Sequence, residues 1–329
     1  MAETGALAEL LPEFSGVVLV TRDGRPVLRE AAGPADASTG RPVTPDSIFQ
    51  LCSVSKQFAA ASVLLLAQDG ALDLHEPITR YLPEAPESWS AITPHHLISN
   101  TSGFVHWQEF PGTDAAGSFT GPELLSLLAD QPLLFAPGTG WRYSSPGFVA
   151  ASTIVERVSG ESYREFTTRR IFAPLGMTST SVAVPVREAA RGHSKGEPYD
   201  APAFSELIGA GDVWSTVDDL ARHAAAFDAG KPLDEQSRRL ATTVQGLIPD
   251  ELKETDGPLA DDGYGYGYVV GTLSGHRVRY HTGDNPGFRT FQLRVPDLDV
   301  SVVILSNRDE TDISQVSAVI LTHFADIFA

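Results

Sequence analysis

Ser53 and Lys56 are the residues whose types and spacing first point to covalent chemistry in this chain. They lie in the segment FQLCSVSKQFAAASVLLLAQDG, residues 49–70, which has the composition of a buried helix. Side chains three residues apart on a helix share one face, with Cβ atoms roughly 5–6 Å apart, whereas Ser55 points about 100° away from Lys56. A serine becomes a nucleophile when a base removes its proton, and burial favours the uncharged form of lysine. The spacing therefore predicts a nucleophile, Ser53, beside its base.

The lysine content of the chain gives an independent argument. Four of the 24 basic residues are lysines, namely Lys56, Lys195, Lys231 and Lys253. Arginine keeps its proton in proteins whereas lysine can lose it, so a lysine in an apolar stretch of an arginine-rich chain suggests that deprotonation matters. A motif as short as S-x-x-K nevertheless recurs by chance, and alone it more often marks a surface lysine at a helix start.

Two further motifs follow Ser53 in the order that a three-part serine-enzyme signature requires. S-x-x-K together with S-D-N and K-T-G is typical of β-lactamases and penicillin-binding proteins. Here Tyr143-Ser144-Ser145 precedes an expected helix, and His281-Thr282-Gly283 ends an expected strand. Other matching blocks are FQLCSVSKQF, ALDLHEPITRYLPE, ITPHHLISNTSGF, PGTGWRYSSPGF, IFAPLGMTST, GAGDVWSTVDDLARH, YGYGY and HTGDNPGF. From about residue 15 to 325 the chain resembles the serine β-lactamase-like family of class C β-lactamases, D,D-peptidases, D-aminopeptidases and EstB-type esterases.

The resemblance implies a role for each matched residue. Ser53 would be the acylated nucleophile, Lys56 its base partner, and Tyr143 the phenol that passes a proton to the leaving group. The substrate-binding residues would be Ser145, His281, Thr282 and Gly283. The backbone N–H groups of Ser53 and Asp284 would form the oxyanion hole. No metal and no cofactor is implied.

Two positions depart from the family pattern. Ser145 stands where the tyrosine motif usually ends in asparagine, and its hydroxyl reaches less far and makes fewer hydrogen bonds. His281 stands where the enzymes acting on lactams and D-Ala-D-Ala commonly carry lysine. Both changes weaken the case for a β-lactam substrate and leave the acyl-enzyme chemistry intact.

Composition and charge exclude several other classes. The 329 residues, 42% hydrophobic, suffice for a sizeable globular core. A formal net charge of −18 repels phosphate backbones and anionic membranes, so neither nucleic acid nor membrane is an expected partner. The single cysteine, Cys52, cannot form an internal disulfide. The first 14 residues lack the basic start and apolar run of a signal peptide, so we expect a cytoplasmic location.

Secondary-structure signals predict an α/β (α+β) fold. Two β-rich runs flank Asp23-Gly24, a dipeptide that suits a tight hairpin. Strand signals return from about residue 264 to 306, a helix is expected at 312–328, and helical segments such as PELLSLLAD and FVAASTIVERVSG occupy the middle. We expect an antiparallel sheet of N- and C-terminal strands flanked by helices, with residues 1–60 and 210–329 as one domain and 61–209 as an inserted helical domain.

Other chemically suggestive residues have simpler interpretations. Cys52 points to another helix face than Ser53 and is expected in the core. Adjacent His95 and His96 do not share a helix face, so a metal site is not expected there. Asp218 and Asp219 suggest the capped N-terminus of a helix. Arg289 is equally consistent with a pocket residue and with a solvated strand residue.

Three functions are consistent with these features. The favoured one is a serine hydrolase that acts on small esters or amides through a Ser53 acyl-enzyme, and an acyltransferase would use the same residues. A β-lactamase or D,D-carboxypeptidase is the first alternative, but the expected cytoplasmic location argues against it. A catalytically silent binding relative is the second, and the intact Ser53, Lys56 and Tyr143 argue against it. The partner is thus a small ester, amide or lactam, and the sequence specifies no oligomeric state.

Overall fold

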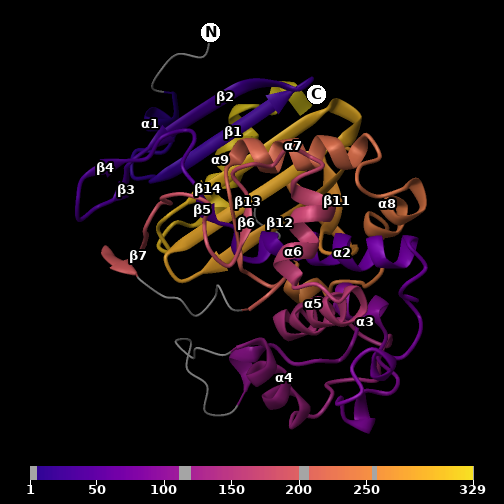
Figure 1. Cartoon of the computed structure of the whole chain (residues 1–329). Helices are drawn as coiled ribbons and strands as arrows, with labels where there is room; N and C mark the ends of the chain where they lie inside the picture. Colours follow the sequence, from indigo (N-terminus) through magenta and orange to yellow (C-terminus); the bar gives the residue numbers. More distant parts are fainter. Residues whose placement is uncertain (1–5, 111–119, 200–206, 254–257, 329) are drawn as a thin grey trace.

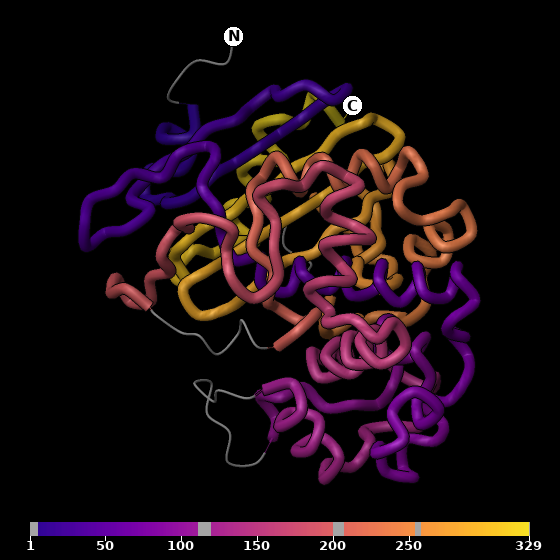
Figure 2. The backbone as a smooth tube through the Cα atoms, in the orientation of Figure 1, coloured from indigo at the N-terminus to yellow at the C-terminus, as the bar shows by residue number. Residues whose placement is uncertain are grey.

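A seven-stranded antiparallel sheet is the centre of the molecule, seen in a computed structural model that describes residues 6–110, 120–199, 207–253 and 258–328. Its strand order is β10-β11-β12-β13-β14-β1-β2. The strands are β1 (Gly16–Arg22), β2 (Arg25–Ala32), β10 (Leu259–Tyr264), β11 (Val269–Leu273), β12 (His276–Asn285), β13 (Phe288–Val295) and β14 (Val300–Ser306). Because β1 pairs with β14, the two ends of the chain share one sheet, and the predicted fold class is confirmed (Figures 1 and 2).

Alternation along the central strands explains why both faces of the sheet are covered. Val17 and Leu19 of β1 belong to one core cluster, and Val18 and Val20 belong to another. This period of two places successive side chains on opposite faces. The predicted hairpin forms between β1 and β2, and both of its turn residues have positive φ, 51° at Asp23 and 68° at Gly24. Hydrophobic burial on both faces therefore fixes the register of β1 within the sheet.

Helices form layers on the two faces of the sheet (Figure 1). One core cluster includes α9 (Ile313–His323) and α1 (Ala6–Leu10), and α7 (Val217–Asp228) contacts β1 and β14 from the other face. The final helix is shorter than the predicted 312–328, because Phe324 leaves the helical conformation and only a short 3-10 turn, Ala325–Phe328, follows. Within the described residues, no helix is both long and apolar enough to cross a bilayer.

A mainly helical region lies below the sheet in Figure 1. Its helices are α3 (Pro94–Ile98), α4 (Gly121–Ala129), α5 (Ser145–Ser159) and α6 (Tyr163–Thr167). The predicted segments PELLSLLAD and FVAASTIVERVSG correspond to α4 and α5, and α5 ends at Gly160 in the left-handed conformation. The other short elements are β3 (Pro34–Asp36), β4 (Arg41–Pro42), β5 (Phe49–Gln50), β6 (Ser181–Val182), β7 (Gly192–Ser194), β8 (Glu197–Tyr199), β9 (Val213–Ser215) and α8 (Glu235–Ala241).

The helix expected over residues 49–70 is divided into three parts. β5 is followed by a 3-10 turn, Cys52–Ser55, and the α-helix α2 runs only over Lys56–Gln68. α2 is buried on nearly all sides and crosses the centre of the molecule between the sheet and α5. The domain limit expected between residues 60 and 61 falls inside α2, and the two-domain division stays a prediction.

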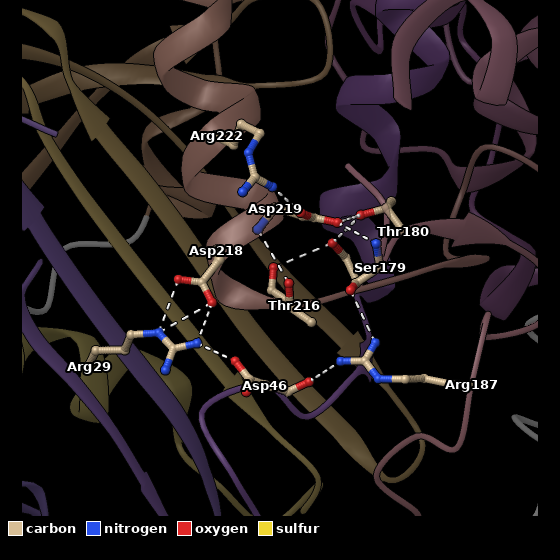
Figure 3. Close-up of polar contacts among 10 residues, drawn as sticks. Arg29, Asp46, Ser179, Thr180, Arg187, Thr216, Asp218, Asp219 and Arg222 are labelled. Carbon is tan, nitrogen blue, oxygen red and sulfur yellow. Dashed lines mark hydrogen bonds and ion pairs between the residues drawn. The ribbon is translucent and has the colours of Figure 1, made fainter. Parts of the chain in front are cut away.

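The N-terminus of α7 is fixed by side chains from several elements (Figure 3). Asp218 and Asp219 lie in the first turn of α7, as expected of an acidic pair at a helix N-terminus. The capping role expected of them is wrong, because the Thr216 side chain accepts the hydrogen bond from the Asp219 N–H group. With Thr216 as the cap, the Asp218 carboxylate is free to bind Arg29 of β2 at 2.6 Å, and Arg29 also binds Asp46 at 2.5 Å.

Candidate active site

The three sequence motifs meet at one cleft of about 490 Å³. The predicted catalytic and substrate-binding residues that line it are Ser53, Tyr143, Ser145, His281 and Thr282. Asp284, predicted for the oxyanion hole, lines it as well. Lys56 lies beneath its floor with no exposed surface. Residues from the two ends and the middle of the chain thus surround one space, as expected for a ligand site.

Ser53 and Lys56 contact each other directly. The Lys56 Nζ atom lies 3.0 Å from Ser53 Oγ and 2.8 Å from the carbonyl oxygen of Ala210. Ser55 is turned away, since its Oγ accepts a hydrogen bond from the N–H group of Val213 at 3.1 Å. The serine expected from the spacing is thus the one that contacts Lys56, although the pair spans a 3-10 turn and the first residue of α2.

Burial governs the charge of Lys56. It lowers the pKa of the ammonium to about 7, while Cys52 and Asp212 act in the opposite direction. Burial also raises the pKa of the Cys52 thiol, so this group is uncharged near neutral pH and Asp212 is the anion that matters there. An amine with a pKa of about 7 is uncharged in a large fraction of molecules at neutral pH, as a general base requires.

Cys52 is a core residue, as expected, and it also shapes the turn. Its side chain is fully buried, and its φ of 52° places it in the left-handed region just before Ser53. Such a conformation is costly for a residue with a Cβ atom and persists where the surroundings enforce it. The turn thus aims Ser53 towards the cleft while Cys52 packs behind it.

Tyr143 faces the same pair from the start of α5. Its ring centroid is 4.9 Å from Lys56 Nζ, and its ring stacks on that of His106 with centroids 5.7 Å apart. Burial raises the pKa of the Tyr143 phenol, and side-chain hydrogen bonds with Ser53 and Ser145 oppose that rise. The phenol therefore keeps its proton near neutral pH and can donate it.

Ser145 has a partner that the sequence did not reveal. Its Oγ lies 3.2 Å from His106 Nε2, while His106 Nδ1 accepts the N–H group of Gln108. Nε2 is consequently the protonated nitrogen and donates to Ser145, whose own hydroxyl proton is left free to donate. Burial lowers the pKa of His106 to about 3, with Lys56 and Arg142 acting in the same direction. No spacing rule pointed to His106, because it lies in a loop with no motif around it.

His281 presents neither charge nor a donor to the cleft. Its Nδ1 lies 2.5 Å from the carbonyl oxygen of Thr282, so this nitrogen carries the proton, and Nε2 accepts from the Tyr264 hydroxyl at 3.0 Å. Burial lowers the pKa of the His281 ring to about 3. The neutrality of His281 at pH 7 therefore has a structural cause beyond the ordinary histidine pKa.

Gly283 explains how β12 approaches the turn that carries Ser53. A Cβ atom at this position would lie 2.1 Å from Thr290 Oγ1, 2.7 Å from Cys52 Cβ and 2.8 Å from the Leu51 carbonyl oxygen. Only glycine permits so close an approach. The next residue along β12, Asp284, lines the cleft together with Ser53, and their predicted role as oxyanion hole stays a prediction.

Two arginines at or beside the cleft are paired with acidic side chains. Arg142 binds Glu109 at 2.9 Å, and Arg289 binds Asp284 at 2.6 Å. Arg142 lines the cleft. Among the described residues, Arg289 is not part of the lining, and its link to the cleft is its ion pair with the lining residue Asp284. An incoming carboxylate would therefore meet no unpaired arginine or lysine among the described lining residues.

The adjacent histidines at 95 and 96 have separate structural contacts. His95 Nδ1 lies 2.6 Å from the Tyr266 hydroxyl, and His96 caps the start of α3 through its ring nitrogen. Within the described parts of the chain, no group of three metal-binding side chains is assembled. Neither histidine adds a ligand to the cleft.

Several known proteins are similar to this chain. Penicillin-binding protein 4* of Bacillus subtilis is 28% identical over 91% of this chain and 69% of its own length. Esterase EstB of Burkholderia gladioli is 39% identical over 49% of this chain, and D-aminopeptidase of Gluconobacter oxydans is 28% identical over 93%. The chain spans 45% and 58% of the length of those two relatives.

Solved structures show the same fold over nearly the whole chain. A D-stereospecific amidohydrolase from Streptomyces sp. superposes with a TM-score of 0.82, at 26% identity, over 98% of this chain and 97% of its own. A D-amino acid amidase from Ochrobactrum anthropi superposes with a TM-score of 0.83 at 23% identity, over 99% of both chains. The predicted resemblance is confirmed, since the family model described as Beta-lactamase matches residues 6–322. The chain therefore belongs to the beta-lactamase family.

Proposed function

We propose that this protein is a serine hydrolase that forms an acyl-enzyme on Ser53 from small esters or amides. One observation carries the proposal, namely the fully buried Lys56 amine 3.0 Å from Ser53 Oγ in a cleft open to small molecules. Uncharged Lys56 removes the Ser53 proton as Oγ bonds to the acyl carbon. The N–H groups of Ser53 and Asp284 receive the oxyanion. As the bond to the alcohol or amine breaks, Tyr143 gives that leaving group a proton and recovers one from the Lys56 ammonium. Water then attacks the acyl-enzyme and loses a proton to the Tyr143 and Lys56 pair, which returns it to Ser53 Oγ as the acid leaves.

The cleft favours substrates without a carboxylate next to the reacting bond. His281 is neutral with both ring nitrogens bonded, and Arg142 is paired with Glu109. Apolar groups of a substrate would contact the lining side chains Trp107, Trp141, Leu207, Ile248 and Leu252. The relatives named as esterase, D-aminopeptidase and D-stereospecific amidohydrolase support this substrate class.

A β-lactamase or D,D-carboxypeptidase is the second candidate. The relative named penicillin-binding protein 4* favours it. Neutral His281 and the short Ser145 side chain oppose it, because they offer less to a carboxylate and to a lactam amide. A silent binding protein would have no need of a buried amine in contact with Ser53. A cytoplasmic location also stays a prediction, which cell fractionation with an antibody would test.

Active-site labelling tests the proposal. We expect a fluorophosphonate probe to label Ser53, identified by peptide mapping, and Ser53→Ala to lose both the label and turnover of p-nitrophenyl esters. Ser55→Ala is the matched control, since Ser55 bonds Val213 N–H away from the cleft. Unchanged labelling of Ser53→Ala would overturn the assignment.

A further inference from the structure

Asp212 lies behind Lys56, in a turn whose shape depends on its carboxylate. The side chain is fully buried, and Oδ1 accepts the N–H group of Gly209 at 3.0 Å. Gly209 has φ of 75°, and a Cβ atom there would lie 1.9 Å from Ser152 Oγ. The turn over residues 209–212 is thus pressed against α5 and closed by Asp212. It carries the Ala210 carbonyl that accepts from Lys56 at 2.8 Å.

Among the described residues, the second oxygen of Asp212 has no hydrogen-bond partner, although it is buried. Burial raises the pKa of the Tyr163 phenol, the Asp212 charge raises it further, and a hydrogen bond with Ser152 opposes the rise. Asp212, Tyr163 and Ser152 therefore form one buried cluster. A buried carboxylate normally has an ion-pair partner or gives up its charge. Asp212 has no ion-pair partner among the described residues, so its charge state is sensitive to the nearby Lys56.

We propose that Asp212 is a positioning residue for the Ser53 reaction: its carboxylate holds the turn that orients Lys56, and its buried charge sets how tightly Lys56 keeps its proton. The inference rests on the proposed function, because it takes Lys56 to be the base for Ser53. It goes further by assigning a residue outside the three motifs to the control of that base.

The charges around the two groups support this assignment. Burial raises the pKa of Asp212 to about 7, and the Lys56 charge opposes that rise, while Lys56 itself has a pKa of about 7. The titratable groups facing Lys56 are Cys52, Tyr143, His106 and His281, and those facing Asp212 are Tyr163 and Arg164. The two histidines titrate near pH 3, the thiol and phenols titrate above neutrality, and arginine stays charged. Near pH 7, Asp212 is therefore the neighbour whose charge changes.

The pH dependence of Ser53 labelling by a fluorophosphonate tests the inference in the full-length protein. Asp212→Asn keeps an oxygen for the Gly209 N–H group but removes the charge. We expect the acidic limb of the rate profile to move to lower pH by about one unit or more. Asp212→Ala also releases the turn, and we expect kcat to fall about 10²-fold with little change in KM.

Asp219→Asn is the matched control. Asp219 is also a buried aspartate, and it accepts hydrogen bonds from Ser179 N and Thr180 Oγ1 at the start of α7. We expect its rate profile to keep the wild-type limb. An unmoved limb in Asp212→Asn, or equal losses in both variants with equal drops in Tm, would overturn the inference. Failure of the wild type to label at Ser53 would instead overturn the proposed function.

A reciprocal measurement avoids dependence on the folding of Asp212 variants. If the Asp212 charge raises the pKa of Lys56, then the Lys56 charge lowers the pKa of Asp212 by the same amount. Removing the Lys56 charge must therefore raise the pKa of Asp212. Carboxyl-carbon NMR of labelled aspartate in wild type and Lys56→Met should show one buried carboxyl whose titration moves to higher pH in the variant. Identical titration in the two proteins would contradict the coupling.

Discussion

The protein contains two groups of opposite charges that differ chiefly in their access to water. The α7 network comprises Arg29, Asp46 and Asp218 (Figure 3). It lies at the surface, with 30%, 75% and 37% of these side chains exposed. Lys56 and Asp212 lie in the interior with 0% exposed. In the first group, the hydrogen bond with Asp218 is the main cause of a raised Arg29 pKa. In the second, burial dominates and drives both pKa values to about 7.

The difference shows that the effect of placing opposite charges close together depends on their access to water. At the surface, water still solvates the charges, so pairing leaves them permanently ionised and contributes about 0.2–1 kcal/mol per pair. In the interior, the loss of hydration outweighs the attraction unless the pair is well hydrogen-bonded. Lys56 and Asp212 make no hydrogen bond to each other, and both change their protonation state near neutral pH. The surface network can therefore hold α7 in place, while only the interior pair can supply a base.

The largest difference in activity should be between two exchanges of lysine and arginine, Lys56→Arg in the interior and Arg29→Lys in the α7 network. Lys56→Arg keeps the charge but cannot release a proton, and we expect Ser53 labelling and ester turnover to fall by about 10²–10⁴-fold. Arg29→Lys makes the reverse exchange in the α7 network and should keep wild-type rates. Circular dichroism checks that both variants are folded, and Lys56→Met serves as a second inactive variant. Near-wild-type turnover by Lys56→Arg would remove the base role.

The second-largest effect should be on the pH dependence of Ser53 acylation, which should depend on Lys56 and not on the α7 network. The uncharged form of Lys56 is the active one, so a pKa of about 7 predicts that acylation rises with pH through neutrality and then levels off. At pH values below the Lys56 pKa, the acylation rate should fall about tenfold for each pH unit. Arg29→Lys should show the same limb, because the α7 network does not touch the cleft. A flat labelling rate from pH 5 to 9 (roughly two units either side of the Lys56 pKa) would contradict the depressed lysine pKa.

Substrate preference should be a smaller effect, set by the neutral residue His281. A hydrogen bond to a charged group is worth about 1.5–3 kcal/mol against about 1 for a neutral one, so the missing cation costs a carboxylate ligand roughly tenfold in binding. We expect p-nitrophenyl acetate, p-nitrophenyl butyrate or a D-amino-acid p-nitroanilide to exceed nitrocefin in kcat/KM. His281→Lys should narrow that gap. Nitrocefin as the best substrate by about an order of magnitude would restore the β-lactamase alternative.

Sequence alone predicted the parts of the site that depend on local spacing. The contact of Ser53 with Lys56 followed from their separation of three residues. The sheet was predicted because β1 and β14 are rich in Val, Leu and Ile. These features are fixed by short-range geometry and hydrophobic patterning, which a single sequence displays.

The remaining features depend on contacts between distant segments. His106 meets Ser145 across 39 positions, and Asp212 acts on Lys56 across 156 positions through a turn. The helix expected over residues 49–70 is divided at Lys56, where Gly283 lies against the preceding turn. No propensity or motif encodes such partners, because they are created when the elements pack together.

The smallest expected effect is the loss of the α7 network. Asp218→Asn weakens the Arg29 ion pair, which is partly exposed, so we expect unfolding free energy to drop by about 0.2–1 kcal/mol. In a protein of this size that corresponds to a decrease in Tm of about 4 °C or less. Raising the salt concentration should shrink the difference from wild type, since exposed charges are screened. Ser53 labelling should stay at the wild-type rate. A loss of labelling without a loss of stability would show that the α7 network reaches the cleft, and the contrast between the two charged groups would then fail.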